Sequence, residues 1–265
     1  MTSCETIDEN DRLVVDDKIP ERPEVERKIL LEEFTGIFCS NCPEATAIAH
    51  DIQKNLGDQL VIVSLHAGDY ARPYQGFDLA SEAAKFYHDY FYTENQRAYP
   101  SAMFSRVKRG SSYVEANPLI WETLVNNRLQ EDFLDGREFS FIIRPEYSEE
   151  DNSIVVRTTI ETIDPLSGVK LQLWLTESKI EGFQIGSGVV YQDYVHNHIL
   201  RDAINGYWGD DISSIPEGST YEMVSEAYTM KDDAWKPENM NVVAFIYDEK
   251  TMEVLDVIEM KLIEE

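Results

Sequence analysis

The chain has 265 residues, enough for one large domain or two ordinary ones. Apolar residues make up 43% of it and aromatic residues 11%, so it can bury real cores and we do not expect a disordered protein. Its formal net charge of −27 repels phosphate backbones and anionic lipid headgroups. This charge argues against nucleic acid as a partner.

The N-terminal residues predict a lipid-anchored tether. Met1-Thr2-Ser3-Cys4 resembles the end of a bacterial lipoprotein signal, in which a small residue precedes the lipidated cysteine. Residues 5–28 are rich in charged residues and proline and have no apolar period, which is typical of a solvated tether. No apolar run approaches the ~18 residues of a membrane span. We therefore expect membrane attachment only through Cys4, with a stray tail cysteine as the alternative.

The next segments predict a strand, a helix and a second strand. Residues 29–34 are a short apolar run, and residues 60–65 are a continuous apolar run of the kind found in strands covered on both faces. Between them the apolar residues follow helical spacing and comprise Ala45, Ile48, Ala49, Ile52 and Leu56. This succession predicts a βαβ unit with a right-handed crossover.

A helical insertion is predicted at about 66–98. Its aromatic residues either pack in a core or form a platform for a peptide or glycan; they are Phe86, Tyr87, Tyr90 and Phe91. Residues 98–104 then read as another strand, and residues 119–129 as a closing helix.

After Gly136 the pattern changes to alternation of apolar and polar residues. It is clear at residues 139–143, 154–160 and 169–175, which are separated by turn-forming residues, and two further strands are predicted near the C-terminus. Strands without intervening helices predict an antiparallel β-sandwich at 137–265. The preceding domain would then span 29–136.

The motif Phe38-Cys39-Ser40-Asn41-Cys42-Pro43 lies at the predicted strand-to-helix junction. Cysteines at i and i+3 of a first helical turn are close enough to bridge, and the helix N-terminus stabilises the thiolate of the first. Cys39 would be the attacking thiol and Cys42 the resolving one. Structural zinc usually needs a second such pair, which is absent from the sequence, whereas a purely structural disulfide stays open as an alternative.

Two more residues occupy positions that resemble those of thioredoxins. Glu33, six residues before Cys39, corresponds to a buried acid that could exchange a proton with Cys42, although an exposed acid is the alternative. Pro100, after Tyr99, stands where that fold places a cis-proline facing the disulfide. The chain differs from thioredoxin at Phe38 and Asn41, which argues against a general disulfide reductase.

Residues 30–45, 194–202 and 241–247 resemble an outer-membrane lipoprotein family of Bacteroidetes. The resemblance implies an α/β thioredoxin-like domain followed by an all-β immunoglobulin-like sandwich. It also implies an envelope protein anchored in the outer membrane, facing the periplasm or the cell surface, which suits Cys4 as the lipidation site.

We therefore predict thiol–disulfide exchange with extracytoplasmic protein or peptide thiols and disulfides, without cofactor or metal. The alternative is a non-catalytic binding or adhesion module with a structural disulfide. A third hypothesis is a metal-dependent enzyme built on His196 and His198, with a further ligand from Asp202, Asp210 or Asp211. The simpler interpretation of this histidine pair is a polar patch that braces a loop.

Overall fold

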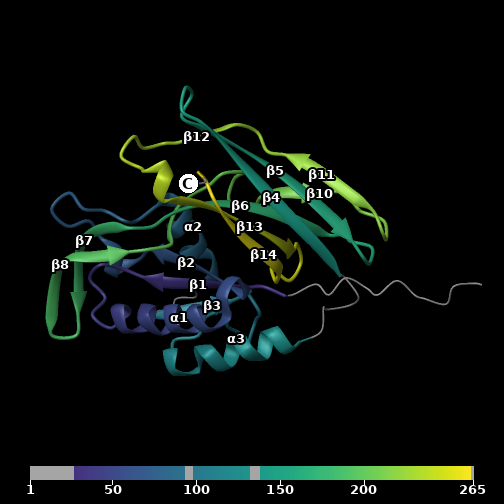
Figure 1. Cartoon of the computed structure of the whole chain (residues 1–265). Coiled ribbons are helices and arrows are strands. Elements are labelled where there is room, and N and C mark those ends of the chain that lie inside the picture. The colour runs from purple at the N-terminus through teal and green to yellow at the C-terminus, as the bar shows by residue number, and fades with distance from the viewer. Residues whose placement is uncertain (1–26, 93–97, 132–137, 264–265) are drawn as a thin grey trace, which may run out of the picture.

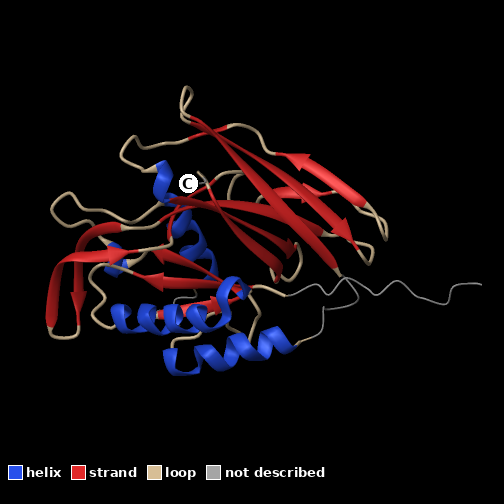
Figure 2. Cartoon of the chain, in the orientation of Figure 1, coloured by secondary structure: helices blue, strands red, loops and turns tan. Residues whose placement is uncertain are grey.

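The computed structural model describes residues 27–92, 98–131 and 138–263 (Figures 1 and 2). The helices are α1 (Cys42–Leu56), α2 (Glu82–Phe91) and α3 (Trp121–Gln130), with short 3-10 turns η2 (Gly57–Gln59), η3 (Asp69–Ala71), η4 (Pro118–Ile120) and η6 (Pro237–Asn239). The strands are β1 (Ile29–Thr35), β2 (Leu60–His66), β3 (Ser101–Phe104), β4 (Phe139–Ser148), β5 (Ser153–Thr162), β6 (Val169–Glu177), β7 (Ile180–Gly186), β8 (Val189–His196), β9 (Ile199–Ala203), β10 (Asp210–Ile212), β11 (Thr220–Val224), β12 (Tyr228–Thr229), β13 (Met240–Asp248) and β14 (Val254–Lys261).

The main sheet has the strand order β14-β13-β6-β9-β2-β1-β3, with β10 also paired to β6. Strand β1 runs parallel to β2 and antiparallel to β3, and β2 meets β9 in parallel at Ser64 and Ile199. A second sheet contains β4, β5, β11 and β12, and β7 and β8 form a separate two-stranded hairpin. Figure 1 shows this hairpin at the end of the molecule where β1 and β2 finish.

Helices cover both faces of the β1–β2–β3 part of the main sheet. Apolar residues of α1 and α3 pack on one face with Leu31 and Ile62, and α2 packs on the other with Leu30 and Val63. Because both faces are covered, all residues of β1 and β2 are buried. Farther along the sheet, the α2 core continues onto β6 and β13, and the second sheet covers their opposite face.

The predicted fold class, a thioredoxin-like α/β domain followed by an immunoglobulin-like sandwich, is wrong. Strands account for 45% of the structure and helices for 21%, and no clear thioredoxin-like α/β domain stands out among the described residues. Strands from before and after residue 136 instead hydrogen-bond in one sheet, since β9 pairs with the edge of β2 and connects it to β6, β13 and β14. A strand edge left open is a template for further pairing, and the C-terminal half supplies the strands that use it.

Three predicted features fall partly or wholly outside the described residues. These are the lipidation site at Cys4 with most of the 1–28 tether, part of the 66–98 insertion, and the boundary at residue 136. Within the described ranges, α2 provides the helix of the insertion. None of the helices described here is long and apolar enough to cross a membrane.

A buried ion pair connects β1 to the turn after β3. The guanidinium of Arg106 donates to both carboxylate oxygens of Glu32, with Nε–Oε2 and Nη2–Oε1 distances of 2.9 Å. Neither side chain is more than 1% exposed. Five aromatic rings lie within 5.8 Å of the guanidinium carbon: Tyr87, Phe91, Trp174, Phe245 and Tyr247. The bidentate geometry and these ring faces compensate two charges that would otherwise be costly to bury.

Candidate functional site

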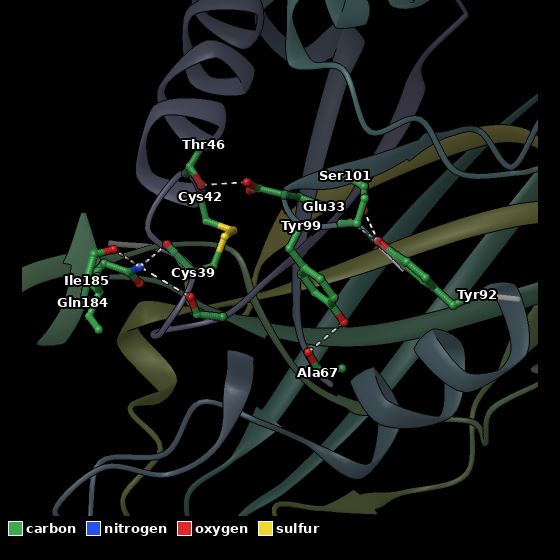
Figure 3. Close-up of a disulfide and its surroundings, with 12 residues drawn as sticks. Glu33, Cys39, Cys42, Thr46, Ala67, Tyr92, Tyr99, Ser101, Gln184 and Ile185 are labelled. Carbon is green, nitrogen blue, oxygen red and sulfur yellow. Dashed lines mark hydrogen bonds between the residues drawn. A yellow bond between two sulfur atoms is a disulfide. The ribbon is translucent and has the colours of Figure 1, made fainter. Parts of the chain in front are cut away.

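The dithiol lies where β1 passes into α1, and Cys39 and Cys42 form a disulfide (Figure 3). Helix α1 begins at Cys42, and Pro43 fits its first turn because N–H groups there have no partner within the helix. The loop is held by backbone hydrogen bonds from Cys39 N to Gly36 O and from Phe38 N to Tyr70 O. The predicted pairing of the two cysteines at a strand-to-helix junction is therefore what the structure has.

Both cysteines are buried, with 3% of Cys39 and 1% of Cys42 exposed. Ser40 and Asn41 between them are exposed, so the loop reaches the surface while its sulfur atoms do not. Phe38 shields the loop in a cluster with the rings of Tyr74 and Phe183, 5.9 and 5.5 Å away between centroids. A substrate can therefore reach the sulfur atoms only if a neighbouring segment moves away.

The hairpin β7–β8 covers the loop. Ile185 N donates to Ile37 O at 2.9 Å. The side-chain amide of Gln184 donates to the carbonyl of Cys39 at 3.2 Å and to that of Gly36 at 3.4 Å. Figure 3 shows the Gln184 amide directed at the dithiol loop. These residues lie about 145 positions beyond the cysteines, and nothing in the sequence pattern predicted their role.

Glu33 is fully buried in β1, which excludes the exposed position considered from the sequence. Its carboxylate accepts a hydrogen bond of 2.7 Å from Thr46, one helical turn after Cys42 (Figure 3), and a longer one from Ser64 on β2. Burial raises the pKa of Glu33 to about 7, and the two hydroxyl donors only partly oppose that shift. Glu33 is therefore poised to gain or lose a proton near neutral pH.

A small cavity of about 20 Å³ adjoins Cys42. Its lining includes Cys42, Thr46, Ser64, His66, Tyr194 and His196. That volume suffices for a single water molecule, and the polar lining offers it partners. Thr46 and Ser64, which bind Glu33, thus line the same cavity as the resolving cysteine.

The histidines of the region do not form the metal pair that was considered as an alternative. The ring of His196 makes an edge contact with that of His66, with centroids 5.6 Å apart, whereas the ring of His198 makes an edge contact with that of His50. Burial lowers the pKa of His196 to about 4 and that of His66 well below its usual value, so both are neutral at pH 7. Among the residues that the structure covers, no three His, Cys, Asp or Glu side chains are placed to hold a metal ion.

The acids considered as further ligands in that alternative have other partners. Asp202 accepts a hydrogen bond from Tyr228, Asp210 from Asn205, and Asp211 pairs with Lys170. His66, which carried no functional prediction, lies at the cavity instead. The sequence could have indicated this position, because His66 ends the strand β2, which runs parallel to β1 and finishes beside it.

The Tyr99–Pro100 peptide bond is cis, and Pro100 is buried just before β3. The hydroxyl of Tyr99 donates to Ala67 O at 3.0 Å, and Tyr92 and Ser101 share a hydrogen bond between their hydroxyls (Figure 3). The first contact connects the segment before β3 to the residue after β2, and the second connects β3 to the residue after α2. A role for Pro100 in binding substrate stays a prediction.

Residues 86–265 match the family described as outer membrane protein Omp28, which is more than half of the chain. The chain belongs to the Omp28 family. This confirms the predicted outer-membrane location. The cysteines and Glu33 lie before the matched residues, so membership of the Omp28 family does not itself assign them a role.

Two of three solved structures resemble this Omp28-family protein over most of its length. HBP35 of Porphyromonas gingivalis is 14% identical, with a TM-score of 0.65 over 91% of this chain and 77% of that one. A protein from Agrobacterium tumefaciens is 13% identical, with a TM-score of 0.52 over 91% and 97%. A domain of the outer membrane lipoprotein Omp28 from Porphyromonas gingivalis is 25% identical over 50% and 93%, with a TM-score of 0.33. No curated protein matches this chain. At such identities the first two likenesses concern the fold alone.

Proposed function

We propose that this outer-membrane protein exchanges thiols and disulfides with extracytoplasmic proteins or peptides through Cys39 and Cys42. The observation that carries the proposal is the buried carboxyl of Glu33, whose pKa is about 7. This carboxyl is hydrogen-bonded to Thr46, one helical turn after a cysteine of the disulfide-forming pair. A structural disulfide has no need of a proton donor and acceptor. An exchanging dithiol needs one, because one cysteine changes its protonation in each cycle.

The reaction runs through a mixed disulfide. In the reduced protein, the Cys39 thiolate attacks a substrate disulfide, forms a bond to one substrate sulfur and releases the other as a thiolate. Cys42 then loses its proton to Glu33, attacks the sulfur of Cys39 and releases the second substrate thiolate. The substrate gains two electrons and the protein regains the Cys39–Cys42 disulfide. The reverse sequence oxidises a substrate dithiol.

The reduction potential of the Cys39–Cys42 couple tests the proposal. We expect a value well above the ~−300 mV below which structural disulfides lie. With a disulfide-linked, fluorescence-quenched peptide as substrate, Cys39→Ser should abolish exchange. Cys42→Ser should accumulate the mixed disulfide at Cys39, because no second thiol resolves it. A potential below that limit and no trapped adduct would refute the proposal.

A second candidate function is a binding module in which the disulfide is a staple. The burial of both cysteines under the hairpin favours it, since a structural disulfide needs no access. In that case the Cys39→Ser/Cys42→Ser variant would lose about 2 kcal/mol of stability, the chain-entropy value for so short a loop. It would also leave any partner binding intact. The lipid anchor at Cys4 is a separate proposal, tested by mass spectrometry of the membrane-bound protein.

A further inference from the structure

We infer that the hairpin β7–β8 is a displaceable cover that selects the substrate of the dithiol. The substrate class would be an extended, cysteine-containing polypeptide segment, and small thiols would be excluded. The inference rests on the proposed exchange function for its substrate, but the cover itself can be tested without that function.

The cover binds the dithiol loop through backbone acceptors. Ile185 N donates to the carbonyl of Ile37, and the Gln184 amide donates to the carbonyls of Gly36 and Cys39, which also accept from Cys39 N and Cys42 N within the loop. If the hairpin leaves, the carbonyl of Ile37 loses its donor and the other two carbonyls keep only the donor within the loop, and an unmade hydrogen bond is costly where water is excluded. An extended polypeptide carries a row of N–H donors and can replace β7 along this segment, as in recognition by strand addition. A small thiol has too few donors to do so.

The hairpin is also built to move as a unit. Its two strands pair with each other in a sheet separate from the other two sheets. It is flanked on both sides by non-glycine residues with positive φ, Lys179 at 60° and His198 at 58°. Such backbone is unfavourable and concentrates at functional sites and switch regions. Residues at the ends of an element that tolerate unusual φ are where hinge motion is absorbed.

Phe183 packs the hairpin against the dithiol loop. It is 8% exposed and packs between Phe38, 5.5 Å away, and Tyr74, 4.2 Å away between centroids. Phe38 immediately precedes the first cysteine, so lifting the hairpin removes ring packing and hydrogen bonds from the same short loop. Opening the cover and exposing Cys39 are therefore one event.

With the cover displaced, a substrate thiolate attacks the sulfur of Cys39 and forms a mixed disulfide. Cys42 leaves as a thiolate and takes a proton from Glu33. A second substrate thiolate then attacks the substrate sulfur of the mixed disulfide. This step releases Cys39 and an oxidised substrate pair, so that two electrons have passed to the protein.

The first experiment measures access alone, as the rate at which tris(2-carboxyethyl)phosphine reduces the disulfide, followed by alkylation and mass spectrometry. Gln184→Ala should accelerate this reduction about tenfold, the effect of losing one or two hydrogen bonds. Phe183→Ala should also accelerate it. Gln192→Ala is the matched control, because this glutamine is exposed on the same hairpin. If both variants react no faster than the wild type and the control, the cover is refuted.

The second experiment addresses the substrate class with a nine-residue peptide that has one central cysteine. At equal thiolate concentration it should reduce the wild-type disulfide at least about tenfold faster than glutathione does, whereas the same peptide with N-methylated backbone flanks should lose that advantage. In Gln184→Ala the difference between peptide and glutathione should shrink. Equal rates for the plain and methylated peptides would overturn the substrate class. A potential below ~−300 mV would instead refute exchange, and the phosphine rates would still decide the cover.

Discussion

Replacing Glu33 with glutamine should remove a pH dependence from the stability of the protein. Glu33 is fully buried, and its pKa rises from 4.5 to about 7 on folding because burial disfavours the charged carboxylate. Glutamine has nearly the same shape, and its carbonyl oxygen still accepts the hydrogen bond from Thr46. The change therefore removes the charge while it preserves the packing and this contact.

The direction follows from which state binds the proton more tightly. Between pH 4.5 and pH 7 the folded protein holds the Glu33 proton and the unfolded chain releases it, so the free energy of unfolding falls as pH rises through this window. A difference of about 2.5 between the two pKa values corresponds to about 3 kcal/mol. From pH 5 to pH 8 the wild type should lose roughly 2.5 kcal/mol through this group. Asp256, whose pKa burial also raises to about 7, contributes equally to both proteins and cancels.

Urea denaturation of the oxidised proteins at pH 5 and pH 8 measures the difference. The decrease in unfolding free energy between these pH values should be smaller in Glu33→Gln than in the wild type by roughly 2 to 3 kcal/mol. Glu150→Gln, in the exposed turn between β4 and β5, is the control and should leave the decrease unchanged. If Glu33→Gln shows the wild-type pH dependence, the buried carboxyl does not titrate near neutrality, and the proton acceptor proposed for Cys42 is lost.

Two further predictions concern the packing around the site. Arg106→Met leaves the charge of Glu32 buried without a partner, so urea denaturation should show a loss of about 3–5 kcal/mol, and adding Glu32→Gln should recover most of it. A loss below about 1 kcal/mol would contradict a tight ion pair. Gly36→Ala would put a Cβ atom 2.4 Å from the backbone carbonyl of Tyr70, so we expect a loss of about 1–3 kcal/mol, whereas an unchanged melting temperature would contradict the close approach.

Local patterns predicted the N-terminal elements well. The apolar runs at 29–34 and 60–65 lie within β1 and β2, and the residues at helical spacing after the cysteines lie within α1. Each pattern reports burial by neighbouring layers, which a short stretch of sequence encodes directly. The position of the dithiol at a strand-to-helix junction could be predicted for the same reason, because the strand, the loop and the start of the helix are contiguous in the chain.

The fold class was predicted wrongly because alternation was interpreted as burial on one face only. In β6 the apolar residues 169, 171, 173 and 175 do face the second sheet, but Trp174 on the opposite face packs in the α2 core. The residues 242–247 of β13 form a continuous apolar run, as in β2, and they are likewise buried on both faces. Such a run indicates a central strand of a sheet covered on both faces. A strand of an antiparallel sandwich, with one face exposed to solvent, would show alternation instead.

The cover over the dithiol could not be predicted, because it depends on pairing between distant segments. Gln184 reads in the sequence as one polar residue in an alternating strand, and only the placement of β7 against Ile37 gives it a role. The same sheet that joins both halves fixes this placement, since β9 follows the hairpin and pairs with β2. The chemistry of Cys39 and its accessibility thus come from different parts of the chain.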